Sequence, residues 1–226
     1  MSIKLIYFKM RALAEAPQML MHYAGIEYEY LMSWVHFDDV WAHVKPTISY
    51  KQLPILIVDD QHEIAQSGSI LRYIEQIAGL SVSDPVAAAQ ADAVLQSAQE
   101  LFAPLNPAVN FATGADFEAK KEAMRPILLS RFDDLERAMA RTDGVFFTGN
   151  TPRACDFAAY HHLDLSRKLD AELITGFPHL EQLVAEIEAL PAISSYLDTR
   201  PELIDVSVEP KLVIDGVAHP TGVTQT

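Results

Sequence analysis

The residues best suited to metal or redox chemistry are a single cysteine and a pair of adjacent histidines. Cys155 is the only cysteine in the chain, so an internal disulfide, a CxxC redox pair and a cysteine-rich zinc site are excluded. His161 and His162 are neighbours in a predicted helix, where adjacent side chains point about 100° apart and do not converge on one ion. Cys155 falls in the same predicted helix, where a buried, inert thiol is expected. We therefore expect no metal site and no thiol–disulfide chemistry.

A second group of residues suits a small anion. Gln66 and Ser67 open a predicted helix, and the unpaired N–H groups and positive dipole end of a helix favour a carboxylate. Ser67 could equally cap its own helix, and the two roles are compatible. Residues 1–80 carry 6 basic and 9 acidic side chains, whereas residues 81–226 carry 11 and 22. An anionic ligand is therefore expected in the first part of the chain.

The elements that must position these residues alternate over the first 80 positions. Hydrophobic periodicity and turn residues predict strand 3–8, helix 14–24, strand 27–33, a short irregular helix 37–45, strand 55–58, strand 62–65 and a helix from Ser67 to Gly79. Pro17 is tolerable only in the first turn of its helix, and Gly25 suits a helix C-cap. The order βαβαββα predicts a small α/β domain over residues 1–80.

Beyond a linker at residues 81–86, the pattern is helical. Helices are predicted over 86–110, 116–141, 154–171, 178–189 and 191–198, the first of them kinked or ended near Pro104 and Pro107. The tail from Leu203 to Thr226 is apolar enough that we expect it to be ordered against the protein, and residues 212–214 have strand character. Residues 87–226 are therefore predicted to form an all-helical domain with an extended C-terminal tail.

Composition excludes several classes of function. The chain has 226 residues, of which 50% are hydrophobic, and a formal net charge of −14. This is apolar enough for a sizeable core, and the negative charge argues against nucleic acid and anionic membrane as partners. No apolar run approaches the roughly 18 residues that a spanning helix needs, and the N-terminus lacks the features of a secretory signal. A single cysteine favours a cytoplasmic location.

The chain resembles the cytosolic glutathione transferases of the tyrosine type, most closely the sigma class. The resemblance is carried by the run from Lys4 to Glu15 (KLIYFKMRALAE), by Gln52-Leu53-Pro54-Ile55-Leu56, and by Ala65-Gln66-Ser67. It extends over all but the last ~20 residues. It implies an α/β plus all-α architecture, with a thioredoxin-like N-terminal domain and a helical C-terminal domain, usually as a homodimer.

By this resemblance, Tyr7 and Arg11 are the predicted catalytic residues. Glutathione is the implied co-substrate, and its thiol has a pKa of about 8.5, whereas the thiolate is the nucleophile. A tyrosine hydroxyl that donates a hydrogen bond to sulfur stabilises the thiolate, and Arg11 would polarise the pair. The alternatives are a core aromatic at Tyr7 and a solvated loop arginine at Arg11. Leu13 stands where a second arginine is common in sigma-type sequences.

The resemblance also assigns the glutathione-binding residues. The bond before Pro54 is expected to be cis, which leaves the N–H and C=O of Leu53 for a peptide-like ligand; the alternative is an ordinary strand-start proline. Gln66 and Ser67 would hold the γ-glutamyl carboxylate. Glu100 would reach the amino group across a dimer interface, although a solvated helix face is an equal alternative. The glycine end of glutathione would be held by the remaining residues of the predicted set: Trp41, Lys45 and Gln52.

The second substrate is expected to be a hydrophobic small-molecule electrophile. Its predicted pocket consists of apolar and aromatic residues, namely Met10, Leu13, Phe102, Leu105 and Tyr160. Tyr50 matches the position of an aromatic key that inserts into a partner subunit in some classes. The predicted function is glutathione transfer, with isomerase or peroxidase activity on the same site, or a non-catalytic ligand-binding relative, as alternatives.

Overall fold

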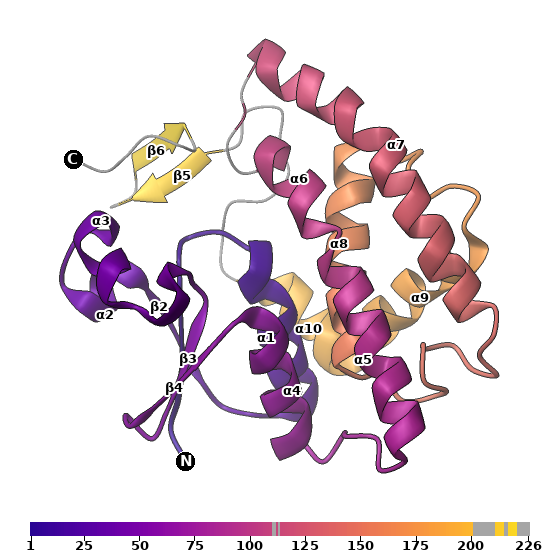
Figure 1. The fold of residues 1–226 in the computed structure, drawn as a ribbon, viewed down its shortest axis with the longest axis horizontal. Helices are drawn as coiled ribbons and strands as arrows, with labels where there is room; N and C mark the ends of the chain where they lie inside the picture. Colours follow the sequence, from indigo (N-terminus) through magenta and orange to yellow (C-terminus); the bar gives the residue numbers. More distant parts are fainter. Residues whose placement is uncertain (110–111, 113, 201–210, 215–216, 221–226) are drawn as a thin grey trace.

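The fold joins a four-stranded sheet to a layer of helices (Figure 1). The structure is a computed structural model that describes residues 1–109, 112, 114–200, 211–214 and 217–220. The first part contains β1 (Ile3–Tyr7), α1 (Ala12–Ala24), β2 (Glu29–Met32), α2 (Ser33–Phe37), α3 (Trp41–Val44), the 3-10 turns η1 (Lys45–Thr47) and η2 (Ser49–Lys51), β3 (Ile55–Val58), β4 (His62–Ala65) and α4 (Ser67–Ile77). The second part contains α5 (Pro85–Gln99), α6 (Phe102–Val109), α7 (Gly114–Met139), α8 (Ala154–Leu169), α9 (Pro178–Ala189) and α10 (Pro191–Thr199), followed by β5 (Lys211–Ile214) and β6 (Val217–Pro220).

The sheet has the strand order β2-β1-β3-β4, in which β1 is parallel to β2 and antiparallel to β3. Leu5 and Ile6 of β1 are both fully buried, so neither face of this central strand meets water. Helices α1 and α4 lie between the sheet and helices α5 and α8 (Figure 1), and α1 contacts α8 and α10. This is the thioredoxin-like domain and helical domain that the resemblance implies. The boundaries at residues 80 and 86 stay a prediction.

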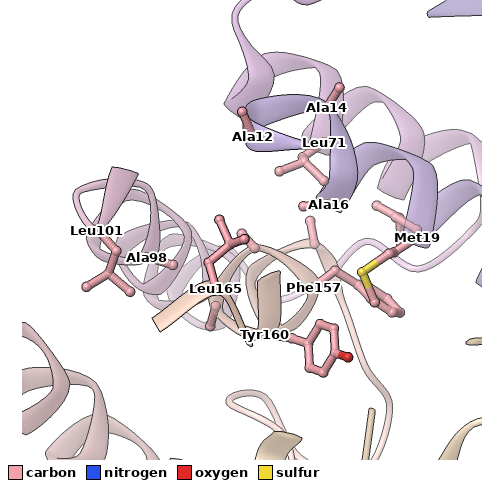
Figure 2. Close-up of a cluster of buried hydrophobic side chains, with 14 of the residues drawn as sticks. Ala12, Ala14, Ala16, Met19, Leu71, Ala98, Leu101, Phe157, Tyr160 and Leu165 are labelled. Atoms are coloured by element: carbon pink, nitrogen blue, oxygen red, sulfur yellow. The ribbon is translucent and has the colours of Figure 1, made fainter. Parts of the chain in front are cut away.

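Helix α1 begins earlier than predicted. It starts at Ala12, so Pro17 lies inside the helix and not in its first turn, and the prediction for Pro17 is wrong. Gly25 ends the helix with φ 64°, a left-handed conformation that glycine adopts without strain, as expected. The small side chain of Ala16 allows α1 to approach the helical layer closely, and Phe157 of α8 lies beside it in the same buried cluster (Figure 2).

The predicted helix 86–110 is two helices. Asp84 caps α5 through a hydrogen bond from the N–H of Ala87 at 2.8 Å, and α5 ends at Gln99. Pro104 has no N–H for the carbonyl group of Glu100, four residues earlier, and its ring crowds that carbonyl group. The break at Glu100 and Leu101 therefore falls one turn before the proline that causes it.

The start of α8 is built around the buried carboxylate of Asp156. Its two oxygen atoms accept hydrogen bonds from the backbone N–H groups of Arg153 and Phe147, each at 2.8 Å. Burial raises the pKa of Asp156 to about 6. The aspartate thus joins the helix start to the preceding loop.

The two chemically suggestive groups on α8 are buried. Burial raises the pKa of the Cys155 thiol well above its usual value, as expected for an inert thiol. His161 and His162 are also buried, with ring centres 5.1 Å apart, and burial lowers the pKa of His162 well below its usual value. Among the described residues, no group of three or more histidine, cysteine or acidic side chains could hold a metal ion.

The predicted strand at residues 212–214 lies within β5, which pairs antiparallel with β6 so that Ile214 faces Val217. Residues 203–210, 215–216 and 221–226 of the tail lie outside the described residues, so the expected packing of the tail stays a prediction. Within the described part of the chain, no helix has the length and apolar character needed to cross a membrane.

Candidate functional site

Tyr7 ends β1 and is buried, with 4% of its surface exposed. Burial raises the pKa of Tyr7 well above its usual value, and the backbone N–H of Leu13, at the start of α1, partly opposes this rise through its contact with the hydroxyl. The hydroxyl is therefore protonated at neutral pH. Burial fits the core-aromatic alternative, but the hydroxyl lies at a helix N-terminus.

The loop between β1 and α1 is held by a tyrosine that the sequence analysis did not single out. The hydroxyl of Tyr30, on β2, donates to the carbonyl oxygen of Phe8 at 2.7 Å and lies 3.3 Å from that of Met10. The ring of Phe8 packs against Tyr7 and, edge to face, against Trp41. The strand pattern around Tyr30 carries no signal for this contact, because it depends on the parallel pairing of β1 and β2.

Arg11 is buried, so the alternative of a solvated loop arginine is wrong. Its Nη1 lies 3.4 Å from both carboxylate oxygen atoms of Glu15, one turn further along α1. Glu15 is fully buried and also receives the Arg200 guanidinium at 2.7 Å and the Tyr196 hydroxyl at 3.2 Å. The arginine predicted for catalysis is thus part of an ion-pair cluster that spans both halves of the chain.

The predicted glutathione-binding residues meet at the open end of the β3–β4 hairpin. Ile55 pairs with Ala65, so Pro54 and Gln66 lie opposite each other beyond the paired strands. The Leu53–Pro54 bond is cis, as expected. A small cavity of about 20 Å³ opens here, lined by Leu13, Tyr50, Gln52, Leu53, Pro54, Ala65, Gln66 and Ser67. The structure therefore brings five of the predicted binding residues together with Leu13, whose N–H contacts Tyr7.

The start of α4 differs in one detail from the prediction. Gln66 occupies the N-cap position with φ 70°, and Ser67 is the first helical residue. Among the described residues, no side-chain hydrogen bond caps α4, so the capping role predicted for Ser67 is not observed. Ser67 is buried at the helix N-terminus, and the Gln66 side-chain amide donates to Oε1 of Gln52 at 3.4 Å. Backbone N–H groups of the first turn are thus left for a ligand.

The remaining predicted binding residues lie further apart. Trp41 is half-buried against Phe8, and Lys45 is exposed where α3 ends. Glu100 is exposed and pairs with Arg131 of α7 at 2.7 Å, within its own chain. Tyr50 is 73% exposed, which leaves its ring accessible.

Four of the five residues predicted for the second-substrate pocket come from the β1–α1 region or from α6. Met10 and Leu105 are buried, whereas Leu13 and Phe102 are half-buried. Tyr160 is 1% exposed, and its hydroxyl donates to Glu188 of α9 at 3.0 Å. This contact ties Tyr160 to α9, within the buried cluster of the helical layer (Figure 2).

Comparison with known proteins decides the family. The profile described as "Glutathione S-transferase, N-terminal domain" matches residues 3–76, and that described as "Glutathione S-transferase, C-terminal domain" matches residues 104–200. The chicken (Gallus gallus) hematopoietic prostaglandin D synthase is 33% identical over 203 residues, which cover 88% of this chain and 96% of the relative. The chain belongs to the glutathione transferase family.

Other glutathione transferases agree in sequence and in fold. Glutathione S-transferase 1 of Ascaris suum is 26% identical over 88% of this chain and 97% of its own length. A crystal structure of a monomeric glutathione S-transferase from the hookworm Necator americanus superposes with a TM-score of 0.77 at 25% identity, covering 89% of this chain and 98% of the other. The protein is thus an enzyme of this family, a glutathione transferase with glutathione as co-substrate.

Proposed function

We propose that this transferase ionises glutathione through a hydrogen bond from Tyr7 and directs the thiolate at a hydrophobic electrophile. One observation carries the proposal. Leu13 lines the cavity at the Gln52–Pro54 and Gln66–Ser67 segments, and its backbone N–H contacts the Tyr7 hydroxyl. The proposed ligand-binding segments and the proton donor therefore meet at one residue. Because burial keeps Tyr7 protonated, the hydroxyl acts as a donor to sulfur and not as a base.

Glutathione is held along the open end of the β3–β4 hairpin. The backbone of Leu53 pairs with the peptide of the ligand, in the manner of an added strand. The first turn of α4, with Gln66 and Ser67, holds the γ-glutamyl carboxylate through N–H groups and the helix dipole. The glycine carboxylate of glutathione is held by Trp41, Lys45 and Gln52. Lys45 supplies an exposed ammonium group in a protein that is otherwise acidic.

The electrophile occupies the apolar side of the same site. The half-buried Leu13 and Phe102 supply aliphatic and aromatic surface, which suits a hydrophobic substrate, and the buried Met10 and Leu105 complete the apolar set. Tyr160 is left out of this pocket because its hydroxyl bonds Glu188 in the helical core.

A structure of the complex with glutathione and the ultraviolet absorbance of the bound thiolate test the proposal together. The expected result is sulfur within hydrogen-bonding distance of the Tyr7 hydroxyl and a thiolate band at neutral pH. Glutathione bound without a thiolate band would instead indicate a ligand-binding relative without catalysis.

A second candidate is a glutathione-dependent isomerase, favoured by the 33% identity with a prostaglandin D synthase. This candidate uses the same thiolate. Product analysis separates the two: an isomerase returns free glutathione, whereas a transferase consumes it.

We also propose a homodimer in which Glu100 reaches the ligand amino group of the partner, in a cytoplasmic enzyme. Glu100 is exposed, and its pair with Arg131 is half-exposed, so the carboxylate can exchange partners at little cost. Glu100→Ala is expected to weaken glutathione binding without lowering stability, with Asp198→Ala on α10 as the control. Full activity of a monomer, the state of the similar hookworm enzyme, would contradict this arrangement.

A further inference from the structure

We propose that His162, on α8, is a specificity-determining residue for the second substrate and favours hydrophobic electrophiles that carry a hydrogen-bond acceptor, such as a nitro or carbonyl group. The proposal rests on the proposed function, because it deepens the account of the pocket that receives the electrophile. His162 is not among the residues predicted for that pocket. Its ring lies next to that of Phe102, the aromatic residue at the start of α6.

The missing partner of the imidazole is the first support. His162 is 2% exposed, and within the described part of the chain its Nδ1 atom has no hydrogen-bond partner. Buried polar side chains in proteins usually have such a partner, so an exception calls for an explanation. Asp156, Tyr160 and Ser166 on the same helix each form a hydrogen bond. A substrate with an acceptor atom supplies to His162 the partner that the protein does not.

The direction of the side chain is the second support. His162 and Tyr160 are two positions apart, which is about 200° around a helix, so their side chains leave nearly opposite sides of α8. Tyr160 bonds Glu188 of α9, whereas the ring centre of His162 lies 6.3 Å from that of Phe102. His162 therefore faces α6, which lies beside α8 and also contacts α1 (Figure 1). Helices α1 and α6 supply most of the proposed electrophile pocket.

The packing around the imidazole leaves it available to a ligand. Helical side chains lean toward the N-terminus of their helix, so His162 lies over Ala158 and Ala159, whose methyl groups offer no hydrogen bond. The ring of Phe102 is tilted by 49° and does not stack flat on the imidazole. Phe102 is also half-buried, so part of its ring is open to the pocket. A flat electrophile that packs on Phe102 thus brings a substituent at its edge toward His162.

His162 acts as a neutral group. Burial lowers its pKa well below the usual value, and the adjacent His161 acts in the same direction. A neutral imidazole carries one N–H donor, so it can donate to a nitro or carbonyl oxygen without placing a charge in an apolar pocket. The recognised electrophile is therefore apolar in its body and has an acceptor at one end. A purely hydrocarbon halide gains nothing from this contact.

The test compares benzyl chloride with 4-nitrobenzyl chloride, which differ only in the nitro group. Their relative intrinsic reactivity is the same for every variant, so the ratio of kcat/KM for the nitro compound to kcat/KM for the other reports recognition of the nitro group. His162→Leu, which removes both ring nitrogen atoms, should lower this ratio by about 3- to 10-fold. His162→Asn, which keeps a polar atom near the position of Nδ1, should retain more of the ratio. Leu163→Met, a volume-conserving change at the next buried position, controls for disturbance of α8.

A purely structural role would lower kcat/KM for both chlorides by the same factor and leave the ratio unchanged in His162→Leu, and that result would overturn the proposal. If His162→Leu fails to fold, calorimetry of wild type with S-benzylglutathione and S-(4-nitrobenzyl)glutathione decides. The nitro conjugate should bind more tightly by about 3- to 10-fold, and equal affinities would overturn the proposal. Binding of these products needs no thiolate. Wild-type protein that conjugates neither chloride would therefore contradict the proposed function, whereas product binding would still decide the role of His162.

Discussion

The hydroxyl of Tyr30 donates a hydrogen bond to the carbonyl oxygen of Phe8, the residue that follows Tyr7, at 2.7 Å. This contact crosses from β2 to the loop after β1, and the parallel register that pairs Tyr7 with Met32 makes it possible. The loop that orients the proposed proton donor is therefore held by a side chain 23 positions after Tyr7.

Removal of this contact should affect turnover more than folding. In Tyr30→Phe, the Phe8 carbonyl loses a partner worth about 1 kcal/mol, and the loop becomes less well oriented. We expect kcat for conjugation to fall several-fold to about tenfold, with glutathione affinity little changed. Steady-state kinetics measure this, with Tyr73→Phe, whose hydroxyl lies at the surface near Met1, as the control. Unchanged kcat would show that the loop is held by its other contacts.

Tyr7→Phe should lower the rate of conjugation at neutral pH by about 10- to 100-fold while glutathione still binds. The hydroxyl acts on the pKa of the thiol, whereas the rest of the ligand is held by the hairpin end and α4. The pH profile of kcat/KM should shift upward, and calorimetry should show near-normal binding. The half-buried Tyr23, converted to phenylalanine, is the matched control. A profile identical to that of wild type would remove Tyr7 from the mechanism.

Asp156→Ala should destabilise the protein by about 2–4 kcal/mol, because it leaves the backbone N–H groups of Phe147 and Arg153 without their acceptor. Urea denaturation measures the loss, and Asp198→Ala, at an exposed position of α10, is the control. A loss of less than about 0.5 kcal/mol would mean that other acceptors replace the carboxylate.

The pH dependence of Asp156 has a defined sign. Burial raises its pKa to about 6 in the folded protein, above the ordinary value of 3.8, so folding takes up a proton between these two pH values. The contribution of Asp156 to stability is therefore fully present below about pH 4 and decreases as pH rises toward 6.

Comparison of wild type with Asp156→Asn, which does not titrate, isolates this effect. The free energy of unfolding of wild type relative to the variant should fall by up to about 2–3 kcal/mol between pH 4 and pH 7. A difference that rises with pH would show that the two backbone N–H bonds outweigh burial and keep the carboxylate ionised.

Local sequence determined the elements whose patterns depend on near neighbours. The hydrophobic run of β3, the turn before β4 and the apolar spacing of α9 predict residues 55–58, 62–65 and 178–189, the ranges observed. Prolines were harder to interpret. A helix can break one turn before a proline, as before Pro104, or continue through it, as α1 does at Pro17. The outcome depends on whether the surrounding packing compensates for the backbone hydrogen bond that proline cannot donate.

The binding segments were also visible in the sequence, because their types and order match a known family. The hairpin register then placed Pro54 opposite Gln66, a relationship that follows from the two-residue periodicity of antiparallel strands. Tyr30, Glu15 and Arg200 carried no local signal of their roles. Glu15 reads as an ordinary first-turn acid of a helix until α10 brings Arg200 and Tyr196 to it.

The physical reason lies in the range of the interactions. Turn chemistry and hydrophobic periodicity act over a few residues, so a single sequence determines the strands, the helices and the thioredoxin-like order. The charge of a buried cluster depends on which distant side chains share one carboxylate. Only the packing of α10 against α1 decided that Arg11 and Arg200 would meet at Glu15.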